Sequence, residues 1–250
     1  MTVEDASWST PSRLRLGHIV YSNCFPVHGM LFDRPCPGDP ALIAGIPSQL
    51  NRMLREGGLD VAPSSSIEYA HNSDRYRILP DLVIGSKGAV RSIVLVSDRP
   101  PNELSGHVVA IPTASATSVL LLKILLRIRW NARPELRWFD QASQHPLAAG
   151  ASAALFIGDV ALRVGLNGSS LARFDLGLEW WEETGLPFAF ALWQAGSGSR
   201  EALRQLHERL LESRAWSALN RRSLAERYSS HFGIPADDLD RYWSDLSYQL

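Results

Sequence analysis

Short apolar segments alternate with helix-like segments along most of this 250-residue chain. The apolar segments predict strands at residues 14–20, 59–62, 77–84, 92–97, 107–111, 135–139, 153–157 and 188–193. Helical patterns occupy residues 47–56, 67–70, 119–128, 178–184, 200–213 and 217–232, and a last helix begins at Pro235. Because a helix between two strands favours a parallel βαβ unit, this alternation predicts an α/β fold.

The order of the segments also predicts the domain organisation. The first part of the chain is rich in strands, a second part has the βαβ pattern, and the strand at 188–193 returns toward the first part. We therefore expect two lobes with a ligand cleft between them. Lobe 1 would comprise residues 13–97 and 188–250, with the C-terminal helices, and lobe 2 would comprise residues 98–187.

The composition limits the partners of the chain. Its formal net charge is −1 at pH 7, so nothing electrostatic favours nucleic acid or an anionic membrane. Apolar runs such as residues 119–122 are far too short to cross a bilayer. Residues 1–12 are polar and lack a basic-then-apolar signal pattern, so we expect a cytoplasmic protein. Tyr242, Trp243 and Tyr248 would suit packing on lobe 1 or a homodimer contact.

No cofactor and no metal are expected. The chain has no phosphate-binding loop and no dinucleotide fingerprint. Cys24 and Cys36 do not form a disulfide framework, and no Cys/His cluster has metal-ligand spacing. No pair of carboxylates stands out for acid–base catalysis. The pattern indicates a polar, uncharged site that is dominated by binding of a small molecule.

A serine-rich turn is the first candidate for that site. A strand is predicted to end at Pro63, and Ser64, Ser65 and Ser66 precede a helix that is predicted to begin at Ile67. A helix N-terminus carries a partial positive charge and unsatisfied N–H groups, so such a turn suits a carboxylate or a phosphate. A serine N-cap without a ligand is the alternative interpretation.

A second turn repeats this arrangement in the predicted lobe 2. Thr113, Ser115, Thr117 and Ser118, with Ala116 among them, lie between a strand and a helix. Hydroxyl groups at this density exceed what one N-cap needs. Because open α/β sheets bind ligands at the carboxyl ends of their strands, two such turns predict a cleft that holds a dianion.

Other candidates lie at strand ends. Ser22 and Asn23 follow the first predicted strand, where Asn23 could hold a hydroxyl or a carboxylate without adding charge. A turn-forming Asn is the alternative. Ser86 lies in a glycine-flanked segment, residues 85–92, that could be a hinge or a ligand-contacting crossover. Asp159 follows a predicted strand. It could be a base or a helix N-cap, of which the cap is favoured. It is also one of the candidate substrate contacts.

Several stretches of the sequence are specific for one protein family when they occur together. They are Leu14-Arg15-Leu16-Gly17 leading to Tyr21-Ser22-Asn23, and residues 45–51, 59–69, 74–76, 79–82, 113–123, 157–159 and 184–188. Together they make the chain similar to the chorismate dehydratases of the futalosine route to menaquinone, over roughly residues 14–193. The chain departs from that pattern at Cys24-Phe25, where Thr-Leu is expected, and at Ala89 and Arg91, where Pro and Gly are expected.

The resemblance implies a two-lobed, type II periplasmic-binding-protein-like fold that serves as an enzyme. It implies a carbon–oxygen lyase that dehydrates the dicarboxylate chorismate to 3-[(1-carboxyvinyl)oxy]benzoate in menaquinone biosynthesis. The cleft contacts of the family carry over to Ser22, Asn23, Ser86 and the two hydroxyl-rich segments, 64–66 and 113–118.

The resemblance also suggests a mechanism. Each hydroxyl-rich turn would bind one carboxylate of chorismate. Because no side-chain base is evident, we hypothesise that the enolpyruvyl carboxylate of the substrate is the base. Asn23 would position it or assist departure of the C4 hydroxyl. Desolvation in a closed cleft would raise the basicity of that carboxylate.

Two alternatives stay open. The related 1,4-dihydroxy-6-naphthoate synthase of the same pathway would require a histidine base, for which His28, beside a candidate loop, is the one candidate. A non-catalytic solute-binding protein for a small carboxylate would need no base, but the lack of a signal pattern argues against it. Cys24 has no partner histidine and asparagine at a suitable spacing, so a buried small side chain is favoured over a nucleophile.

Overall fold

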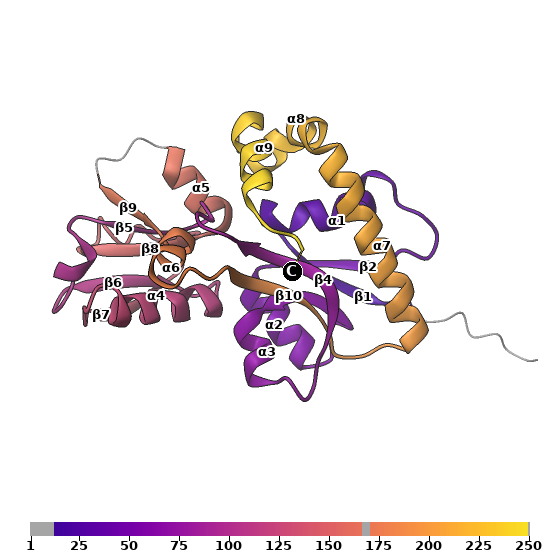
Figure 1. Ribbon diagram of the computed structural model, residues 1–250, viewed down its shortest axis with the longest axis horizontal. Coiled ribbons are helices and arrows are strands. Elements are labelled where there is room, and N and C mark those ends of the chain that lie inside the picture. Colours follow the sequence, from indigo (N-terminus) through magenta and orange to yellow (C-terminus); the bar gives the residue numbers. More distant parts are fainter. Residues whose placement is uncertain (1–12, 167–170, 250) are drawn as a thin grey trace, which may run out of the picture.

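The computed structural model describes residues 13–166 and 171–249, and the polar segment 1–12 lies outside them. Its strands are β1 (Arg15–Ile19), β2 (Ala41–Gly45), β3 (Val61–Ser65), β4 (Arg77–Ser86), β5 (Ile93–Ser97), β6 (Val108–Pro112), β7 (Glu135–Phe139), β8 (Ala153–Ile157), β9 (Ala172–Asp175) and β10 (Phe188–Ala195). They form two five-stranded sheets, ordered β2-β1-β3-β10-β4 in lobe 1 and β7-β6-β8-β5-β9 in lobe 2. The two lobes lie end to end in Figure 1.

Helices cover both faces of each sheet. They are α1 (Phe25–Asp33), α2 (Pro47–Arg55), α3 (Ser66–His71), α4 (Ala116–Ile128), α5 (Gly158–Leu166), α6 (Leu176–Thr184), α7 (Arg200–Leu219), α8 (Arg221–Phe232) and α9 (Ala236–Asp245), with short 3-10 turns η1 (Ser22–Cys24) and η2 (Pro101–Glu103). Figure 1 shows α1 and α7 on one face of the lobe 1 sheet and α2 and α3 on the other. Among the described residues, no helix combines the length and apolar composition that a membrane span requires.

The sheets are mixed rather than wholly parallel. In lobe 1, β1 pairs in parallel with β2 and β3, while β10 is antiparallel to β3 and β4. In lobe 2, β6 pairs in parallel with β7 and β8, while β5 is antiparallel to β8 and β9. Strands β3, β5 and β8 are buried along their whole length, because helices cover both of their faces.

One strand belongs to a different lobe from the one predicted. Residues 92–97 were expected to belong to lobe 1, but β5 pairs with β8 and β9 in the lobe 2 sheet. The chain therefore crosses between the lobes after β4, near residues 87–92, and returns after α6, near residues 185–187. The apolar sequence of β5 specifies a buried strand, but nothing in it specifies which sheet the strand joins.

Other element boundaries also differ from the prediction. Strand β3 continues through Ser65 instead of ending at Pro63, since Ser64 and Ser65 pair with Leu192 and Ala191 of β10. The sequence analysis did not predict β2, β9, α1 or α5. The helix that was predicted to end at residue 213 continues, as α7, to residue 219.

Hydrogen bonds to one carboxylate and a close backbone approach hold the first crossover against α6. Asp175, the N-cap of α6, accepts hydrogen bonds from the backbone N–H groups of Gly177 and Leu178. The same carboxylate accepts from the backbone N–H groups of Val90 and Arg91. A Cβ on Gly177 would lie 2.7 Å from the carbonyl oxygen of Gly88, so this close approach requires glycine.

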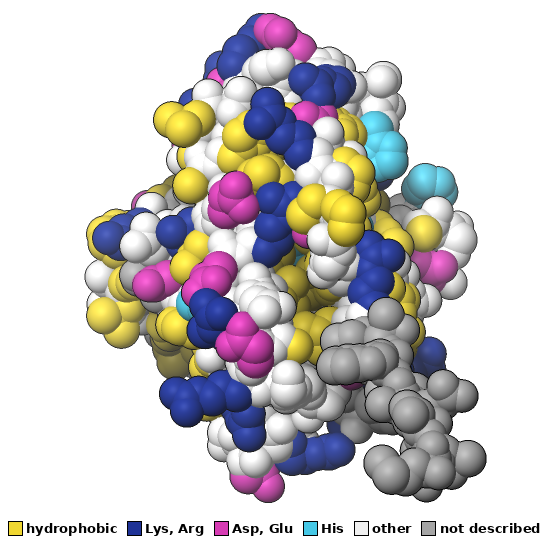
Figure 2. All heavy atoms as spheres, turned by 90° about the vertical axis from the view of Figure 1, so that its right-hand side faces the viewer, with side chains coloured by type: hydrophobic (Ala, Val, Ile, Leu, Met, Phe, Trp, Pro, Cys, Tyr) yellow, Lys and Arg dark blue, Asp and Glu magenta, His cyan; other side chains and the backbone are white. Residues whose placement is uncertain are grey.

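The outer face of lobe 1 has no large area of one charge. Figure 2 shows basic and acidic side chains interspersed over it, around small hydrophobic areas. Ion pairs such as Arg209 with Asp39 and Arg221 with Asp240 connect neighbouring elements of lobe 1. Charges of both signs are thus mixed on this face.

Candidate functional site

The cleft lies where strands of both sheets end. The residues that line it are Ile19, Tyr21, Asn23, Pro47, Ser65, Ile84, Ser92, Ile93, Ser115, Thr117, Ser118, Ile157, Gly158, Phe190 and Ala191. The cavity between them has a volume of about 50 Å³. Drug-sized ligands occupy pockets of roughly 300–1,000 Å³, so the lobes are closed on one another in this structure.

The cleft lining is polar but uncharged. Its side chains include hydroxyls from both lobes and one amide, and no Asp, Glu, His, Lys or Arg is among the described lining residues. Tyr21 is the one titratable side chain, and burial raises the pKa of its phenol. Such a lining can donate hydrogen bonds to a carboxylate but offers no strong base.

Asn23 lies in η1, which follows β1 after two residues. Its Oδ1 is buried and has no hydrogen-bond partner among the described residues. A buried polar atom without a partner is rare in folded proteins and destabilises them, so it indicates a functional role. Asn23 also lines the cleft, and its free acceptor is thus available to a ligand hydroxyl.

Ser22 and Asp159 are brought together from opposite lobes. The Asp159 carboxylate accepts from the Ser22 backbone N–H at 3.0 and 3.1 Å and from its hydroxyl at 2.6 Å. Burial raises the pKa of Asp159, while the hydrogen bonds from Ser22 oppose that shift. The two residues satisfy each other, and neither lines the cavity.

The predicted serine turn is partly engaged with α2. Asn51 accepts from the Ser64 hydroxyl at 2.6 Å and donates to the Ser65 hydroxyl oxygen at 2.7 Å. Ser64 is fully buried and directed toward Asn51, whereas Ser65 lines the cleft. The sequence analysis did not select Asn51, although a polar residue beside the buried Leu50 of α2 was a usable signal.

The two hydroxyl-rich segments meet across the cleft. The Thr117 hydroxyl oxygen accepts from the Ile67 backbone N–H at 3.3 Å and lies 3.4 Å from the Ser66 hydroxyl oxygen. Ser115 caps α4, because its side chain accepts from the Ser118 backbone N–H. The N-terminal ends of α3 and α4, from different lobes, therefore face each other as the sequence predicts.

The remaining candidates lie outside the cavity. Ser86 donates to the Gly88 carbonyl oxygen at 3.0 Å and so stabilises the first crossover. Thr113 and Ala116 are exposed and do not line the cavity. Gly158, which the sequence analysis did not select as a contact, faces the Tyr21 ring so closely that a Cβ there would lie 2.6 Å from it.

A buried cluster lies behind the Asn23 turn. The ligand atoms of His18, Cys24 and His28 all lie within 4.8 Å of one another, a grouping that sequence spacing did not reveal. Trp193 donates to Nε2 of His28 at 3.0 Å, so the neutral His28 ring carries its proton on Nδ1, which lies 3.0 Å from Nδ1 of His18. A protonated Nδ1 cannot ligate a metal, so the cluster fits hydrogen-bonded packing.

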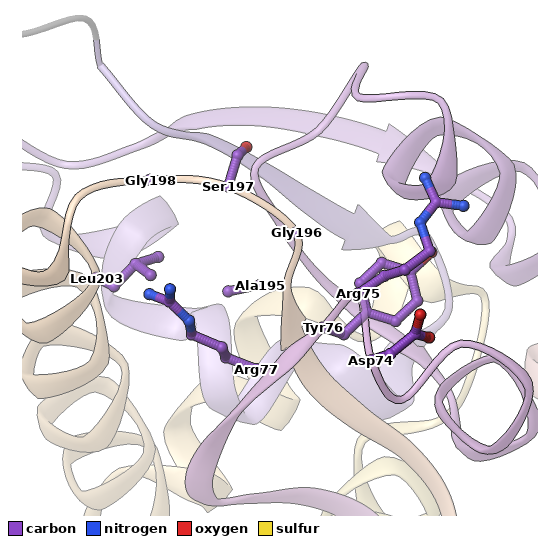
Figure 3. Close-up of a pocket in the computed structure, with 9 residues that line it drawn as sticks. All are labelled: Asp74, Arg75, Tyr76, Arg77, Ala195, Gly196, Ser197, Gly198 and Leu203. Atoms are coloured by element: carbon purple, nitrogen blue, oxygen red, sulfur yellow. The ribbon is translucent and has the colours of Figure 1, made fainter.

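A further cavity of about 190 Å³ lies at the opposite end of strands β4 and β10 from the cleft. Figure 3 shows it between the start of β4 and the loop that follows β10. Arg75 and Arg77 point in different directions there, and Ser197 donates to Asp60 at 2.7 Å. Its polar side chains do not converge on one point, so the cleft is the better candidate site.

The fold and the cleft define a two-lobed, periplasmic-binding-protein-like class. A solved structure of an Archaeoglobus fulgidus protein superposes with a TM-score of 0.79 at 20% identity, over 94% of this chain and 88% of that one. The periplasmic aliphatic sulphonate binding protein SsuA of Escherichia coli gives a TM-score of 0.66 at 16% identity, over 96% and 86%. These likenesses confirm the predicted fold class.

The chain belongs to the menaquinone biosynthesis family, whose model matches residues 14–250. A chorismate dehydratase from Thermus thermophilus is 30% identical over 250 residues, which cover 94% of this chain and 89% of that protein. A chorismate dehydratase from Campylobacter jejuni is 33% identical over 179 residues, which cover 70% and 64%. The resemblance that the sequence motifs indicate is thereby confirmed.

Proposed function

We propose that this protein dehydrates chorismate to 3-[(1-carboxyvinyl)oxy]benzoate on the futalosine route to menaquinone. Both curated relatives carry the name chorismate dehydratase, and the family is that of menaquinone biosynthesis. The observation in this chain that carries the proposal is Asn23, whose buried, unpartnered Oδ1 lies in a cleft that is otherwise lined by hydroxyl and apolar groups.

The lining supports a reaction in which the substrate supplies its own base. Among the described lining residues there is no carboxylate, histidine or lysine, and burial raises the pKa of the Tyr21 phenol. The enolpyruvyl carboxylate removes the proton from C3, and the acid so formed returns a proton to the C4 hydroxyl, which leaves as water. The ring gains aromaticity in this step, so the driving force resides in the substrate.

The protein would bind and orient the reacting groups. Ser65 from lobe 1 and Ser115 and Ser118 from lobe 2 can donate to the two carboxylates without adding charge. Asn23 would accept a hydrogen bond from the C4 hydroxyl or orient the reacting carboxylate. Closure of the lobes excludes water, which would otherwise weaken the basicity of that carboxylate.

The geometry disfavours the related naphthoate synthase reaction, which calls for a histidine base. No histidine is among the described residues that line the cleft. His28, the sequence-based candidate, is fully buried, and both of its ring nitrogens have partners in the cluster behind the turn. A cytoplasmic location and a homodimer stay predictions.

The test is incubation of the purified protein with chorismate, followed by chromatography and absorbance for an aromatic product. We expect Asn23→Ala to lower turnover about 100-fold, the effect of losing one preorganised polar group in an active site. Asn102→Ala, at an exposed position in η2, is the matched control. Full turnover by Asn23→Ala would eliminate the role of Asn23. Thermal stabilisation by chorismate without any product would indicate a solute-binding protein instead.

A further inference from the structure

Helix α9 and the residues after it contact three residues, each of which is next in sequence to a residue that lines the cleft. Trp243 donates from Nε1 to the Ser22 carbonyl oxygen at 2.8 Å. Asp245 pairs with Arg91 in the first crossover. Ser247 and Gly85, near the end of β4, exchange two backbone hydrogen bonds of 2.8 and 2.9 Å. A distant part of the sequence thus holds the Asn23 turn, the crossover and the strand that leads to it.

The hydrogen bond from Trp243 is made to the peptide group between Ser22 and Asn23. The Ser22 carbonyl belongs to the same planar peptide as the Asn23 nitrogen, so a hydrogen bond to this oxygen fixes the orientation of that plane. The only other donor to this oxygen among the described residues is the Phe25 backbone N–H. Trp243 is 3% exposed and stacks on Phe25, with ring centroids 5.5 Å apart, so the indole itself is held in place.

The rest of the turn is equally constrained. The Ser22 backbone N–H and hydroxyl both donate to Asp159, and the Cys24 backbone N–H donates to Tyr21. Among the described residues, the Asn23 Oδ1 is the buried side-chain polar atom of this turn that has no partner. Such a pattern is expected of a turn whose purpose is to present one amide to a ligand, because a fixed acceptor loses no orientational freedom on binding.

We propose that Trp243 is a positioning residue for the Asn23 amide. Its indole N–H holds the Ser22–Asn23 peptide so that Oδ1 of Asn23 faces the reacting atoms of the substrate. The inference rests on the proposed function for its kinetic consequence, but its structural consequence can be measured without any turnover.

The kinetic test is a double-mutant cycle between Trp243→Phe and Asn23→Ala. Phenylalanine retains a ring for the stack on Phe25 and removes the N–H donor together with part of the indole volume, a loss of volume that the control Trp180→Phe shares. We expect Trp243→Phe to lower kcat about tenfold, the effect of one lost buried hydrogen bond, with KM changed less than about twofold. In the Asn23→Ala background the same substitution should have no further effect on kcat. An equal loss in both backgrounds would mean that Trp243 does not act through Asn23.

The structural test is amide hydrogen exchange of a peptide that spans residues 21–25. Trp243→Phe should raise its exchange rate about tenfold, because the turn then opens more readily. The matched control is Trp180→Phe, which removes an indole N–H that has no hydrogen-bond partner among the described residues. It should leave both readouts unchanged.

The two tests separate the inference from the proposed function. If the wild-type protein does not turn over chorismate, the proposed function fails, and the exchange rate alone decides the role of Trp243. Wild-type exchange at residues 21–25 in Trp243→Phe overturns the inference in either case.

Discussion

His18 and His28 are held neutral inside lobe 1. Burial lowers the pKa of His18 to about 4 and lowers that of His28 well below its ordinary value. The unfolded chain exposes both rings to water, where a histidine has a pKa of about 6.5. Below that pH the unfolded state therefore binds more protons than the folded state, and the folded state loses stability.

We expect the free energy of unfolding to fall as the pH decreases from about 7 to about 4. His18 contributes on the order of 1–3 kcal/mol to this decrease in the free energy of unfolding, because the pKa of its side chain in the folded protein is about 4. Urea unfolding across this range should show a shallower decrease for His18→Gln than for the wild type. His145→Gln, at an exposed position in lobe 2, is the control. Identical curves for the wild type and His18→Gln would contradict the assignment.

Cys24 is the other buried member of that cluster. Burial raises the pKa of its thiol to about 12, so almost no thiolate forms near neutral pH. Cys36 is exposed. A disulfide exchange reagent should therefore modify one thiol in the native protein and a second only after unfolding. Rapid reaction of Cys24 in the native protein would show that the cluster is open to solvent.

The first crossover contains a strained residue. Arg91 has a φ of 60°, a left-handed conformation that favours glycine, and it stands where the sequence pattern of the family leads us to expect glycine. Asp175 accepts from the Arg91 backbone N–H, and Asp245 pairs with its side chain. Contacts from two other elements thus keep the backbone in this conformation.

Two variants distinguish the effect of backbone strain at Arg91 on stability from the effect of its ion pair with Asp245. Arg91→Ala and Arg91→Gly both remove the pair with Asp245, but only glycine relieves the backbone. We expect Arg91→Gly to be more stable than Arg91→Ala by about 1 kcal/mol, as read from denaturant midpoints. A midpoint for the alanine variant equal to or above that of the glycine variant would refute the strain.

The elements that the sequence did not predict have physical reasons. Strand β9, with the sequence ARFD, is partly exposed and lacks the apolar run that predicted the others, whereas β2, with the sequence ALIAG, is apolar and was missed although it is only partly buried. Helix α1 contains Pro26 and Gly29, which are typical of turns. Pro26 is tolerated in its first turn. Gly29 is needed because a Cβ there would lie 2.4 Å from the Ser217 hydroxyl oxygen of α7.

The candidate site was predictable in its residue types but not in its pairings. The hydroxyls of Ser65, Ser115 and Thr117 line the cleft because they lie at or after the ends of strands that meet there. That Ser64 bonds to Asn51, and Ser22 to Asp159, follows from side-chain directions between different elements, which for Ser22 and Asp159 are far apart in the chain. Local patterns contain no information on such long-range partners, so substrate contacts at these residues stay predictions.

The closed cleft has a consequence for the whole molecule. A cavity of about 50 Å³ is too small for a ten-carbon dicarboxylate, so the lobes have to separate for substrate to enter. The two crossovers are the natural hinges, and Gly88 and Gly185 have positive φ angles there. Opening would break the contacts of Thr117 with Ser66 and Ile67, which join the lobes.

A reversible cross-link tests this requirement. The Ser66 and Thr117 side-chain oxygens lie 3.4 Å apart, so cysteines at both positions, with Cys36→Ser, can form an interlobe disulfide. We expect oxidation to reduce chorismate turnover more than about tenfold and a reductant to restore it. Each single-cysteine variant controls for the substitutions. Full turnover by the oxidised double variant would show that the lobes need not separate.

Strand β10 has a consequence for how the protein is made. It lies between β3 and β4, yet its residues follow the whole of lobe 2 in the sequence. During synthesis, the nascent chain therefore completes every strand of lobe 2 before the lobe 1 sheet can close. Until β10 leaves the ribosome, the edges of β3 and β4 have no partner and are open to wrong pairing or to a chaperone. The sheet of lobe 1 is thus the last to be completed.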